Sequence, residues 1–435
     1  MSTPPERALR IMVVTDQYES MVGGVPTVTR ELARGLAKRG HQVALVVPSP
    51  GWRGRRTSVE QVTVMYRGSV RWPWYEGMRL GCLPASAAGK LIASFAPDVA
   101  HIHSPVTLGV MARIGAGRRR VPVVYTNHYL PANVRASTAP RARALDALFY
   151  RHVVGFSNKC SYVTAPTATA LGLLRERGLR VPSGVLSNGV DLGAYSPGLA
   201  DVRIRHRYGL PAGRPLILSV GRLSPEKRTD VLLDAVARLG PDTQVAIAGA
   251  GPDEARLRSQ ARRLGLAGKV RFLGFVPGSD LPGLYRLADV FAIASEAELQ
   301  SLTTMEAMAT GLPVVAVDAY ALAELVRHGH NGFLARPGHA AEVAAYLDQL
   351  CSDPCLRARM SAASLRIISG HERQRWLDEW ESLYRMLARR GQAIDDQSAD
   401  GPDSRPPPPG RSDRQGPGNG GPDRMTIENV PRAVV

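Results

Sequence analysis

Two acidic residues with a helix start between them could do chemistry in this sequence. Glu298 lies in a polar loop, and Glu306 lies in the helix expected over residues 302–309. The amides of Ser301, Leu302 and Thr303 would open that helix, where free N–H groups and the helix dipole favour an anion. A phosphate could bind there, with a carboxylate on either side for sugar hydroxyls. An acid in a first helical turn can also serve the dipole alone, and spacing leaves both interpretations open.

The elements that would position these groups alternate between strand and helix. Residues 291–294 and 314–317 are short apolar runs, typical of buried parallel strands, and the helix stands between them. Gly311 followed by Pro313 gives the usual order of stop signals after a helix.

The segment from Glu298 to Glu306, Glu-Leu-Gln-Ser-Leu-Thr-Thr-Met-Glu, resembles the E-x7-E element of retaining GT-B glycosyltransferases known as family 4. The resemblance implies that Glu298 holds hydroxyls of the donor sugar and that Glu306 holds the nucleotide ribose. Ser301 departs from the family pattern, which usually has glycine there. A serine at that position would be strained if the backbone needed a positive φ.

Two further loops carry phosphate-binding features. Gly23-Gly24 precedes an expected helix and forms either a phosphate cradle or a plain tight turn. The pair does not match the G-x-G-x-x-G fingerprint of dinucleotide-binding proteins. Arg222 and Lys227 flank the loop after the strand 216–220, so both cations can reach one anion near a helix N-terminus. The family resemblance implies that the glycines approach the donor diphosphate and that Arg222 and Lys227 clamp it.

His128 follows the expected strand 121–126, at the edge where open α/β sheets bind ligands. The family resemblance of Thr126-Asn-His128 implies that this histidine reaches the donor sugar and the reacting centre. The strand and loop expected over 270–276 resemble the family segment that touches the nucleobase through its backbone, which implies this role for the backbone near Val276. His101 and His103 would share one face of a strand, and without a third ligand they are interpreted as core or cleft-lining residues rather than a metal pair.

The whole pattern predicts an α/β protein of GT-B class, with two Rossmann-like domains whose parallel sheets face each other across a cleft. We expect an acceptor-side domain over residues 1–200 and a nucleotide-sugar domain over 201–370. A terminal helix over 371–390 would cross back onto the first domain. Residues 391–435 are rich in Pro, Gly, Asp, Ser and Arg, a composition that predicts disorder.

Composition limits the class of protein. A chain of 435 residues that is 44% hydrophobic predicts two globular domains, and it has no 18-residue apolar run and no signal-peptide core. Four scattered cysteines fit a reducing cytoplasm. Residues 1–200 hold 25 Lys or Arg against 10 Asp or Glu, which places +15 of the net +17 in the first half.

A basic half implies a polyanionic partner, and charge alone does not choose among nucleic acid, anionic lipid and phosphorylated acceptors. Residues 52–80, rich in Arg and Trp, are expected to form an irregular or hairpin insertion near the acceptor side; this composition suits a membrane surface, stacking on bases or sugars, or an ordinary exposed loop. The stretch 135–151 is expected to be a basic amphipathic helix with Leu145, Leu148 and Phe149 on its apolar side, either at a membrane surface or as an ordinary solvated helix. Zinc-finger, RNA-recognition and helix-turn-helix signatures are missing, so nucleic acid is the disfavoured partner. We expect a cytoplasmic protein, peripheral on the inner face of the membrane; the oligomeric state is not predicted.

These features together predict a retaining hexosyltransferase that uses a UDP- or GDP-linked sugar and a lipid acceptor. The alternative acceptor is a small soluble molecule, and a non-catalytic GT-B protein is a further hypothesis prompted by Ser301. No D-x-D sequence occurs in the chain, so no metal and no cofactor are expected. Arg222, Lys227 and the helix amides would take over the stabilisation of the leaving diphosphate.

Overall fold

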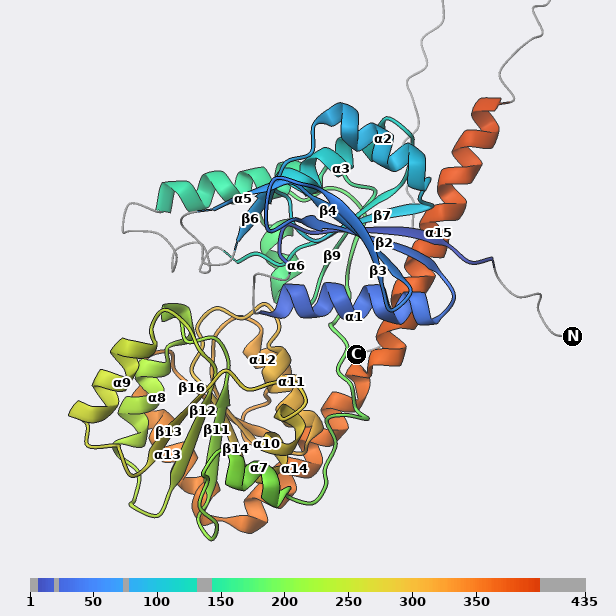
Figure 1. The fold of residues 1–435 in the computed structure, drawn as a ribbon. Helices are drawn as coiled ribbons and strands as arrows, with labels where there is room; N and C mark the ends of the chain where they lie inside the picture. Colours follow the sequence, from blue (N-terminus) through green and yellow to red (C-terminus); the bar gives the residue numbers. More distant parts are fainter. Residues whose placement is uncertain (1–6, 19–22, 73–77, 131–142, 400–435) are drawn as a thin grey trace, which may run out of the picture. The chain divides into compact units, whose positions relative to one another are not determined.

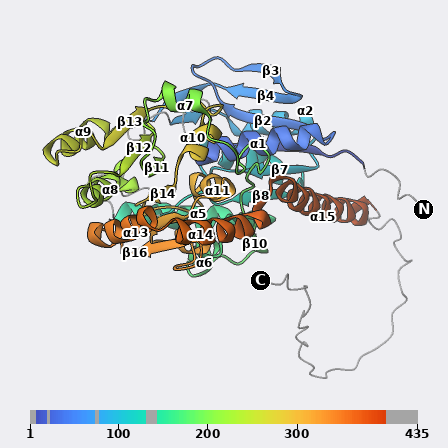
Figure 2. The same ribbon diagram turned by 90° about the horizontal axis from the view of Figure 1, so that it is seen from below.

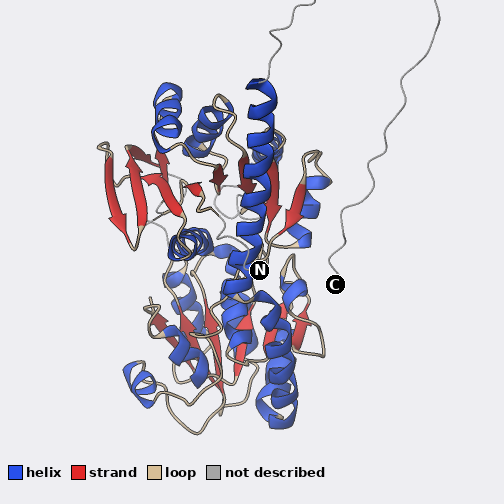
Figure 3. Cartoon of the chain, turned by 90° about the vertical axis from the view of Figure 1, so that its right-hand side faces the viewer, coloured by secondary structure: helices blue, strands red, loops and turns tan. Residues whose placement is uncertain are grey.

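The computed structural model of the protein describes residues 7–18, 23–72, 78–130 and 143–399. Two mainly parallel sheets follow each other along the chain, and helices cover both faces of each (Figure 1; Figure 3). Contacts group Met1–Gln392 into one compact unit. They leave Ala393–Val435 as a second unit, of which only the end of the last helix is described.

The first lobe runs from β1 to β10 and contains an eight-stranded sheet of order β10-β9-β8-β7-β1-β2-β4-β3, in which only β3 is antiparallel to its neighbour. Two short antiparallel strands, β5 and β6, form a separate hairpin. The elements of this lobe are β1 (Arg10–Val14), α1 (Gly24–Lys38), β2 (Gln42–Pro48), β3 (Arg55–Val59), β4 (Val62–Arg67), β5 (Ser69–Arg71), β6 (Arg79–Gly81), α2 (Ala85–Phe95), β7 (Val99–Ile102), α3 (Thr107–Gly117), β8 (Val123–Thr126), α5 (Arg143–Ser157), β9 (Tyr162–Ala165), α6 (Ala168–Arg175) and β10 (Ser183–Val185).

Strand β1 shows how the apolar run builds a three-layer lobe. Alternate residues of a strand point to opposite faces. Ile11 and Val13 accordingly pack in a cluster with α1, whereas Met12 and Val14 pack in a second cluster with α2, α3 and α5. A strand buried on both faces needs continuous apolar sequence, which the run Ile11–Val14 provides.

The second lobe runs from α7 to η3 and contains six parallel strands of order β13-β12-β11-β14-β15-β16. Helices α8, α9 and α13 pack together, as do α10, α11 and α14, and Figure 2 shows α13 beside α14. Its elements are α7 (Val202–Arg207), β11 (Leu216–Val220), η2 (Pro225–Lys227), α8 (Thr229–Val236), β12 (Gln244–Ala248), α9 (Glu254–Arg263), β13 (Val270–Gly274), α10 (Leu281–Leu287), β14 (Val290–Ile293), α11 (Leu302–Ala309), β15 (Val314–Val317), α12 (Leu322–Leu325), β16 (Gly332–Ala335), α13 (Ala340–Ser352), α14 (Pro354–Ile368) and η3 (Ser369–His371).

The last helix, α15 (Arg373–Ala399), contributes to the core of the first lobe. Trp376, Trp380 and Tyr384 are buried in the same cluster as Ile11 and the apolar face of α1. The Asn188–Asp191 turn holds the start of this helix, because Val190 N donates to His371 O and Arg373 N donates to Val190 O. Arg373 also pairs with Asp191 at 2.7 Å.

The observed fold confirms the α/β class and the two Rossmann-like sheets, and it corrects three local expectations. Within 52–80, β3 and β4 belong to the central sheet and only β5–β6 is a hairpin insertion, because Val62, Val64 and Tyr66 bury one face of β4. Residues 73–77, in that stretch, lie outside the described residues. Helix α15 continues to Ala399, beyond the expected end of the helix, and residues 400–435 are not described.

Of the basic stretch 135–151, the described part begins with α5 at Arg143, and residues 135–142 lie outside the described residues. Leu148, expected on the apolar side, is 62% exposed, whereas Tyr150 and Val153 are buried. Among the described helices, none combines the length and the apolarity needed to cross a bilayer.

Candidate active site

The loop before α11 and the first turn of that helix form the centre of the site. Ser301 is the N-cap residue, and its Oγ accepts a hydrogen bond from Thr304 N at 3.3 Å. The amides of Leu302 and Thr303, at the first two helical positions, have no intrahelical acceptor by helix geometry. Ser301 has φ −84° and ψ 104°, so a serine fits this backbone without strain. The glycine usual in the family is not needed here for its conformation.

Lys227 and Glu298 form an ion pair at this loop. Lys227 Nζ lies 2.6 Å from Glu298 Oε1, and the Glu298 side chain is 10% exposed. The backbone of Glu296 donates to Glu226 O at 3.1 Å, which ties the two loops together. Arg228 pairs with Glu296 on the same side. The sequence predicted a cation and an acid for one donor site, and the structure brings these two into contact.

Arg222 is half-buried in the loop after β11, two residues past the end of the strand. Two glycines let a neighbouring loop approach the loop of Arg222: a Cβ on Gly249 would lie 1.8 Å from Gly221 O, and one on Gly251 would lie 2.2 Å from Leu223 O. Gly249 also has φ +144°. The Gly249-Ala-Gly251 sequence therefore serves backbone packing at the carboxyl edge of the second sheet.

Glu306 lies one turn into α11 in a desolvated position. Tyr285 Oη donates to Glu306 Oε2 at 2.9 Å and is also 3.1 Å from Thr303 O. Burial raises the pKa of Glu306 from 4.5 to about 7, although hydrogen bonds from Tyr285 and Tyr195 lower it. The carboxylate is thus an acceptor held by neutral donors, in contrast to the ion-paired Glu298.

The glycine pair of the first lobe meets α11. Gly24 opens α1, and a Cβ placed on it would lie 3.8 Å from Leu302 Cδ1. Leu302 packs against the main core clusters of both lobes. Gly23 has an extended backbone with φ 166°. The N-terminus of α1 and the N-terminus of α11 are therefore close neighbours, as a phosphate site made by both loops would require.

His128 ends a row of three histidine rings on β7 and β8. It lies two residues past β8 and shares a hydrogen bond with His103 Nδ1 through its Nε2, at 2.9 Å. His101 bonds Tyr384 Oη at 2.6 Å through Nδ1 and Thr126 Oγ1 at 2.7 Å through Nε2. Burial lowers the pKa of His128 from 6.5 to about 4 and lowers the pKa values of His101 and His103 well below their usual 6.5, so all three rings are neutral at pH 7.

Hydrogen bonds join the loops of the two lobes beside the site. Gln300 Oε1 accepts from Asn188 N at 2.7 Å, and Thr167 Oγ1 donates to Leu299 O at 2.9 Å. Glu324 accepts from the amides of Ala168 and Thr169, the first residues of α6. These contacts hold the loop that carries Glu298 against the carboxyl edge of the first sheet.

Several residues of the site escaped sequence reasoning. Asp16 is buried at the end of β1 and accepts hydrogen bonds from Ser104, Thr107 and the Leu108 amide, which fixes the turn after His103. Burial raises the pKa of Asp16, and these donors lower it. A polar residue directly after a buried strand was the signal that could have identified it. Tyr195 and Tyr285, which hold Glu306, carried no such signal because tyrosines at those spacings are common core residues.

The described contacts connect the predicted residues unequally. Lys227 contacts Glu298, Gly24 lies beside Leu302, and Tyr285 hydrogen-bonds both Thr303 O and Glu306. Val276 is buried in the core of the second lobe after β13. The roles of Val276, Arg222 and His128 towards the donor stay predictions.

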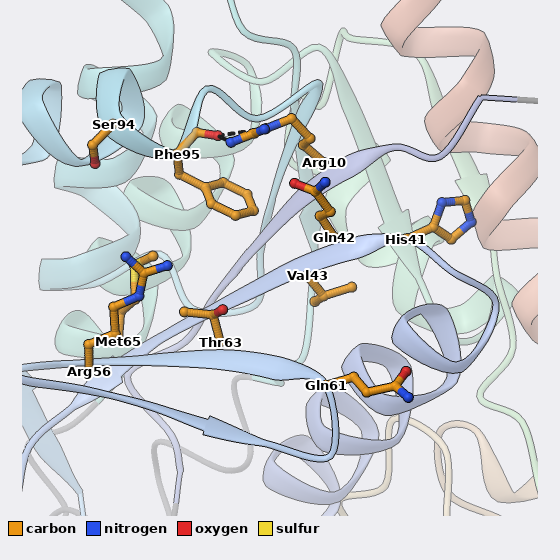
Figure 4. Close-up of a pocket in the computed structure, with 10 residues that line it drawn as sticks. All are labelled: Arg10, His41, Gln42, Val43, Arg56, Gln61, Thr63, Met65, Ser94 and Phe95. Atoms are coloured by element: carbon orange, nitrogen blue, oxygen red, sulfur yellow. Dashed lines mark hydrogen bonds between the residues drawn. The ribbon is translucent and has the colours of Figure 1, made fainter.

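A pocket of about 350 Å³ lies at the opposite, amino-terminal edge of the first sheet (Figure 4). Its lining includes Arg10, His41, Gln42 and Phe95, where β1 and β2 begin and α2 ends. Arg10 is engaged there, because its guanidinium donates to Phe95 O at 2.8 Å. The pocket is separate from the groups described above. Among the described residues, no group of three His, Cys, Asp or Glu side chains is arranged to hold a metal ion.

Two family models match the two lobes of the chain. The family model for glycosyl transferases group 1 matches residues 202–366, and the model for glycosyltransferase family 4 matches residues 22–194. The chain is 32% identical to a D-inositol 3-phosphate glycosyltransferase of Thermomonospora curvata, over 84% of this chain and 92% of that protein.

It is 27% identical to an alpha-monoglucosyldiacylglycerol synthase of Streptococcus pneumoniae, over 71% of each chain. The structure of Anabaena HepE in complex with UDP and glucose is similar, with a TM-score of 0.68 at 22% identity, covering 90% of this chain and 100% of that one. This structural likeness shows the fold.

Proposed function

Since this chain belongs to glycosyltransferase family 4, we propose that it transfers a hexosyl group from a UDP- or GDP-linked sugar to a lipid acceptor at an anionic membrane surface. The transfer retains the anomeric configuration and needs no metal ion. The main support for the donor site is the ion pair between Lys227 and Glu298, because it lies directly before the N-terminal amides of α11.

The donor fits this site group by group. Lys227, Arg222 and the amides of Leu302 and Thr303 supply positive charge and N–H donors to the diphosphate. Gly24 lets the start of α1 approach the same phosphates from the first lobe. Glu298 accepts from sugar hydroxyls and Glu306 accepts from the ribose hydroxyls. HepE, which was solved with UDP and glucose, supports a nucleotide-sugar donor.

Retention follows most simply from attack on the face of the sugar that the diphosphate leaves. The acceptor oxygen forms the new bond to the anomeric carbon while the bond to the diphosphate oxygen breaks, and that oxygen takes the acceptor proton. Glu298 is engaged by Lys227 and acts as a sugar ligand rather than a nucleophile. The cations and amides stabilise the charge that develops on the diphosphate, which is the task a metal ion performs elsewhere.

A lipid acceptor is supported by the exposed surface of the first lobe. Trp52 is 73% exposed and Trp72 is 36% exposed, and Arg53 and Arg55 are exposed beside Trp52 in the chain. Tryptophan with arginine is the composition of membrane-interface contacts. The monoglucosyldiacylglycerol synthase relative also supports a lipid acceptor.

A small phosphorylated acceptor is the second candidate, because the D-inositol 3-phosphate glycosyltransferase is the relative with the higher identity over more of the chain. Co-sedimentation with liposomes, with and without anionic lipid, separates the two. If the acceptor is a lipid, the protein should bind anionic vesicles, and the double variant Trp52→Ala/Arg53→Ala should bind them more weakly. Equal recovery in the supernatant with both vesicle types would favour the soluble acceptor.

The donor site is tested by thermal shift against UDP- and GDP-sugars, followed by transfer assays with chelator present. A donor at a hundred times its Kd stabilises the folded state by about 2.7 kcal/mol. We expect Lys227→Ala and Arg222→Ala to lose the shift and to slow transfer by about a hundredfold or more. Arg262→Ala, which removes an exposed arginine of α9, is the matched control and should behave as wild type. Normal turnover in both site variants would refute the donor site, and activity restored only by magnesium would refute metal independence.

A further inference from the structure

His103 and His128 are joined by one shared proton. Their rings lie within 13° of parallel, and His103 Nδ1 is 2.9 Å from His128 Nε2. Two ring nitrogens at that distance repel unless one carries a hydrogen directed at the other. Because both rings are buried and neutral, exactly one of these two nitrogens is protonated.

Two arrangements of that proton are open, and they give His128 opposite properties. If His103 donates from Nδ1, its Nε2 is bare, and His128 carries its own proton on Nδ1. If His128 donates from Nε2, His103 accepts at Nδ1 and carries its own single hydrogen on Nε2, and His128 Nδ1 is bare. The first arrangement makes His128 Nδ1 a hydrogen-bond donor, and the second makes it an acceptor.

The surroundings of His103 decide between them. His103 is 1% exposed, and its Nε2 has no hydrogen-bond partner among the described residues. A buried N–H without an acceptor is rarer and more costly than a buried acceptor without a donor. The arrangement with a bare His103 Nε2 is therefore the stable one.

The neighbouring ring keeps His103 in place. His101 lies with its ring centroid 3.9 Å from that of His103, and it is itself held at both nitrogens, by Tyr384 and by Thr126. Tyr384 belongs to α15, so the terminal helix contributes to the orientation of this row. His101 and His103 are the H-x-H pair that the sequence placed on one face of a strand.

We propose that His103 is a positioning residue that fixes His128 as its Nδ1–H tautomer, so that His128 donates a hydrogen bond to an oxygen of the donor sugar and does not act as a base. The contact with the sugar rests on the proposed function, whereas the tautomer rests on the geometry of the two rings alone.

Nuclear magnetic resonance of the full chain with 15N-labelled histidine tests the tautomer. Two-bond correlations between ring protons and nitrogens distinguish a protonated from a bare nitrogen, and His128→Gln and His103→Asn identify the two spin systems. We expect Nδ1 protonated and Nε2 bare on both rings. A spectrum with His128 protonated on Nε2 overturns the proposal.

Kinetics test the consequence. His103→Leu removes the donor to His128, and we expect kcat to fall about tenfold while the affinity for UDP, which has no sugar, stays unchanged. His103→Asn can replace the Nδ1–H donor with its amide and should restore activity to within about threefold of wild type. His152 on α5 hydrogen-bonds Pro105 O through Nε2, and a glutamine can supply the same donor. His152→Gln is therefore the matched control and should leave kcat unchanged.

Full activity of His103→Leu, with the spectrum of His128 the same as in wild type, would also overturn the proposal. The two readouts separate the hypotheses. If no sugar nucleotide is turned over but His128 carries its proton on Nδ1, the proposed function fails and the positioning role of His103 stands.

Discussion

Glu298 and Glu306 lie on the same short segment but in opposite electrostatic surroundings. Glu298 contacts the ammonium group of Lys227, whereas Glu306 is desolvated and faces the hydroxyls of Tyr285 and Tyr195. Burial favours the protonated form of Glu306. The two acids of the E-x7-E segment therefore respond differently to substitution.

We expect Glu306→Gln to stabilise the protein at high pH. Because the folded-state pKa of about 7 exceeds the ordinary 4.5, the charged form increasingly destabilises the folded state as pH rises through that window. Gln keeps an acceptor for Tyr285 without the charge. Its advantage over wild type in urea denaturation should be below about 1 kcal/mol at pH 5 and up to about 3 kcal/mol at pH 8. An advantage of equal size at both pH values would contradict the shifted pKa.

Glu298→Gln should separate diphosphate binding from transfer. The substitution removes the negative charge beside Lys227 Nζ, so phosphate no longer competes with a carboxylate for that ammonium group. We expect UDP or GDP to bind as tightly as to wild type, or up to about tenfold more tightly, while transfer falls about a hundredfold. Glu296→Gln, which removes the partner of Arg228 instead, is the control and should leave nucleotide affinity unchanged. A large loss of nucleotide affinity in Glu298→Gln would contradict the assigned roles.

At the scale of elements, α11 shows how a short helix can both pack and bind. Its first turn presents unbonded amides, and Met305, Ala307 and Met308 are fully buried in the core of the second lobe. Ser301 caps the third amide of the helix and leaves the first two for a ligand. The cap therefore sets the position at which the helix begins.

Removing the cap should cost stability in a graded way. We expect Ser301→Ala to lower the free energy of unfolding by about 1 kcal/mol and Ser301→Gly by only a few tenths. Urea denaturation of the three proteins with equal m-values measures the difference. A stabilising effect of glycine, or an equal loss in both variants, would show that the helix does not depend on the Ser301 hydroxyl.

At the scale of the molecule, the terminal helix α15 follows the second lobe in the chain but packs into the core of the first lobe. Trp380 is 2% exposed in the cluster that also contains β1 and α1, and its ring lies 4.5 Å from that of His101. The first lobe is therefore incomplete without residues more than 180 positions away from its last strand. Its stability depends on this docking.

Trp380→Ala should destabilise the first lobe by about 3–5 kcal/mol, since it leaves a large cavity in a close-packed core. Hydrogen exchange measures this by region: amides of β1 and β7 should exchange faster, and amides of β11 and β14 should change little. Glu379→Ala on the exposed side of the same helix is the control and should stay within about 0.5 kcal/mol of wild type. Uniform loss of protection in both lobes would mean that they unfold as one unit.

The sequence by itself determined the order of strands and helices, because buried parallel strands are continuous apolar runs and helices carry stop signals such as Gly311. The range 302–309 for the central helix agrees with the structure, and the family and the enzyme class predicted from the E-x7-E segment are confirmed. These features are local in the chain, so local patterns suffice to find them.

Only the tertiary structure decided which groups meet. The contact between Lys227 and Glu298, the tyrosines around Glu306, and the bond between His103 and His128 join residues between 21 and 111 positions apart, or lie on neighbouring strands. The same holds for Ser301, whose fit depended on a backbone angle, and for β3 and β4, which belong to the sheet because one face of β4 is buried. Side-chain contacts across a sheet depend on register and packing, and neither is written in the spacing of one segment.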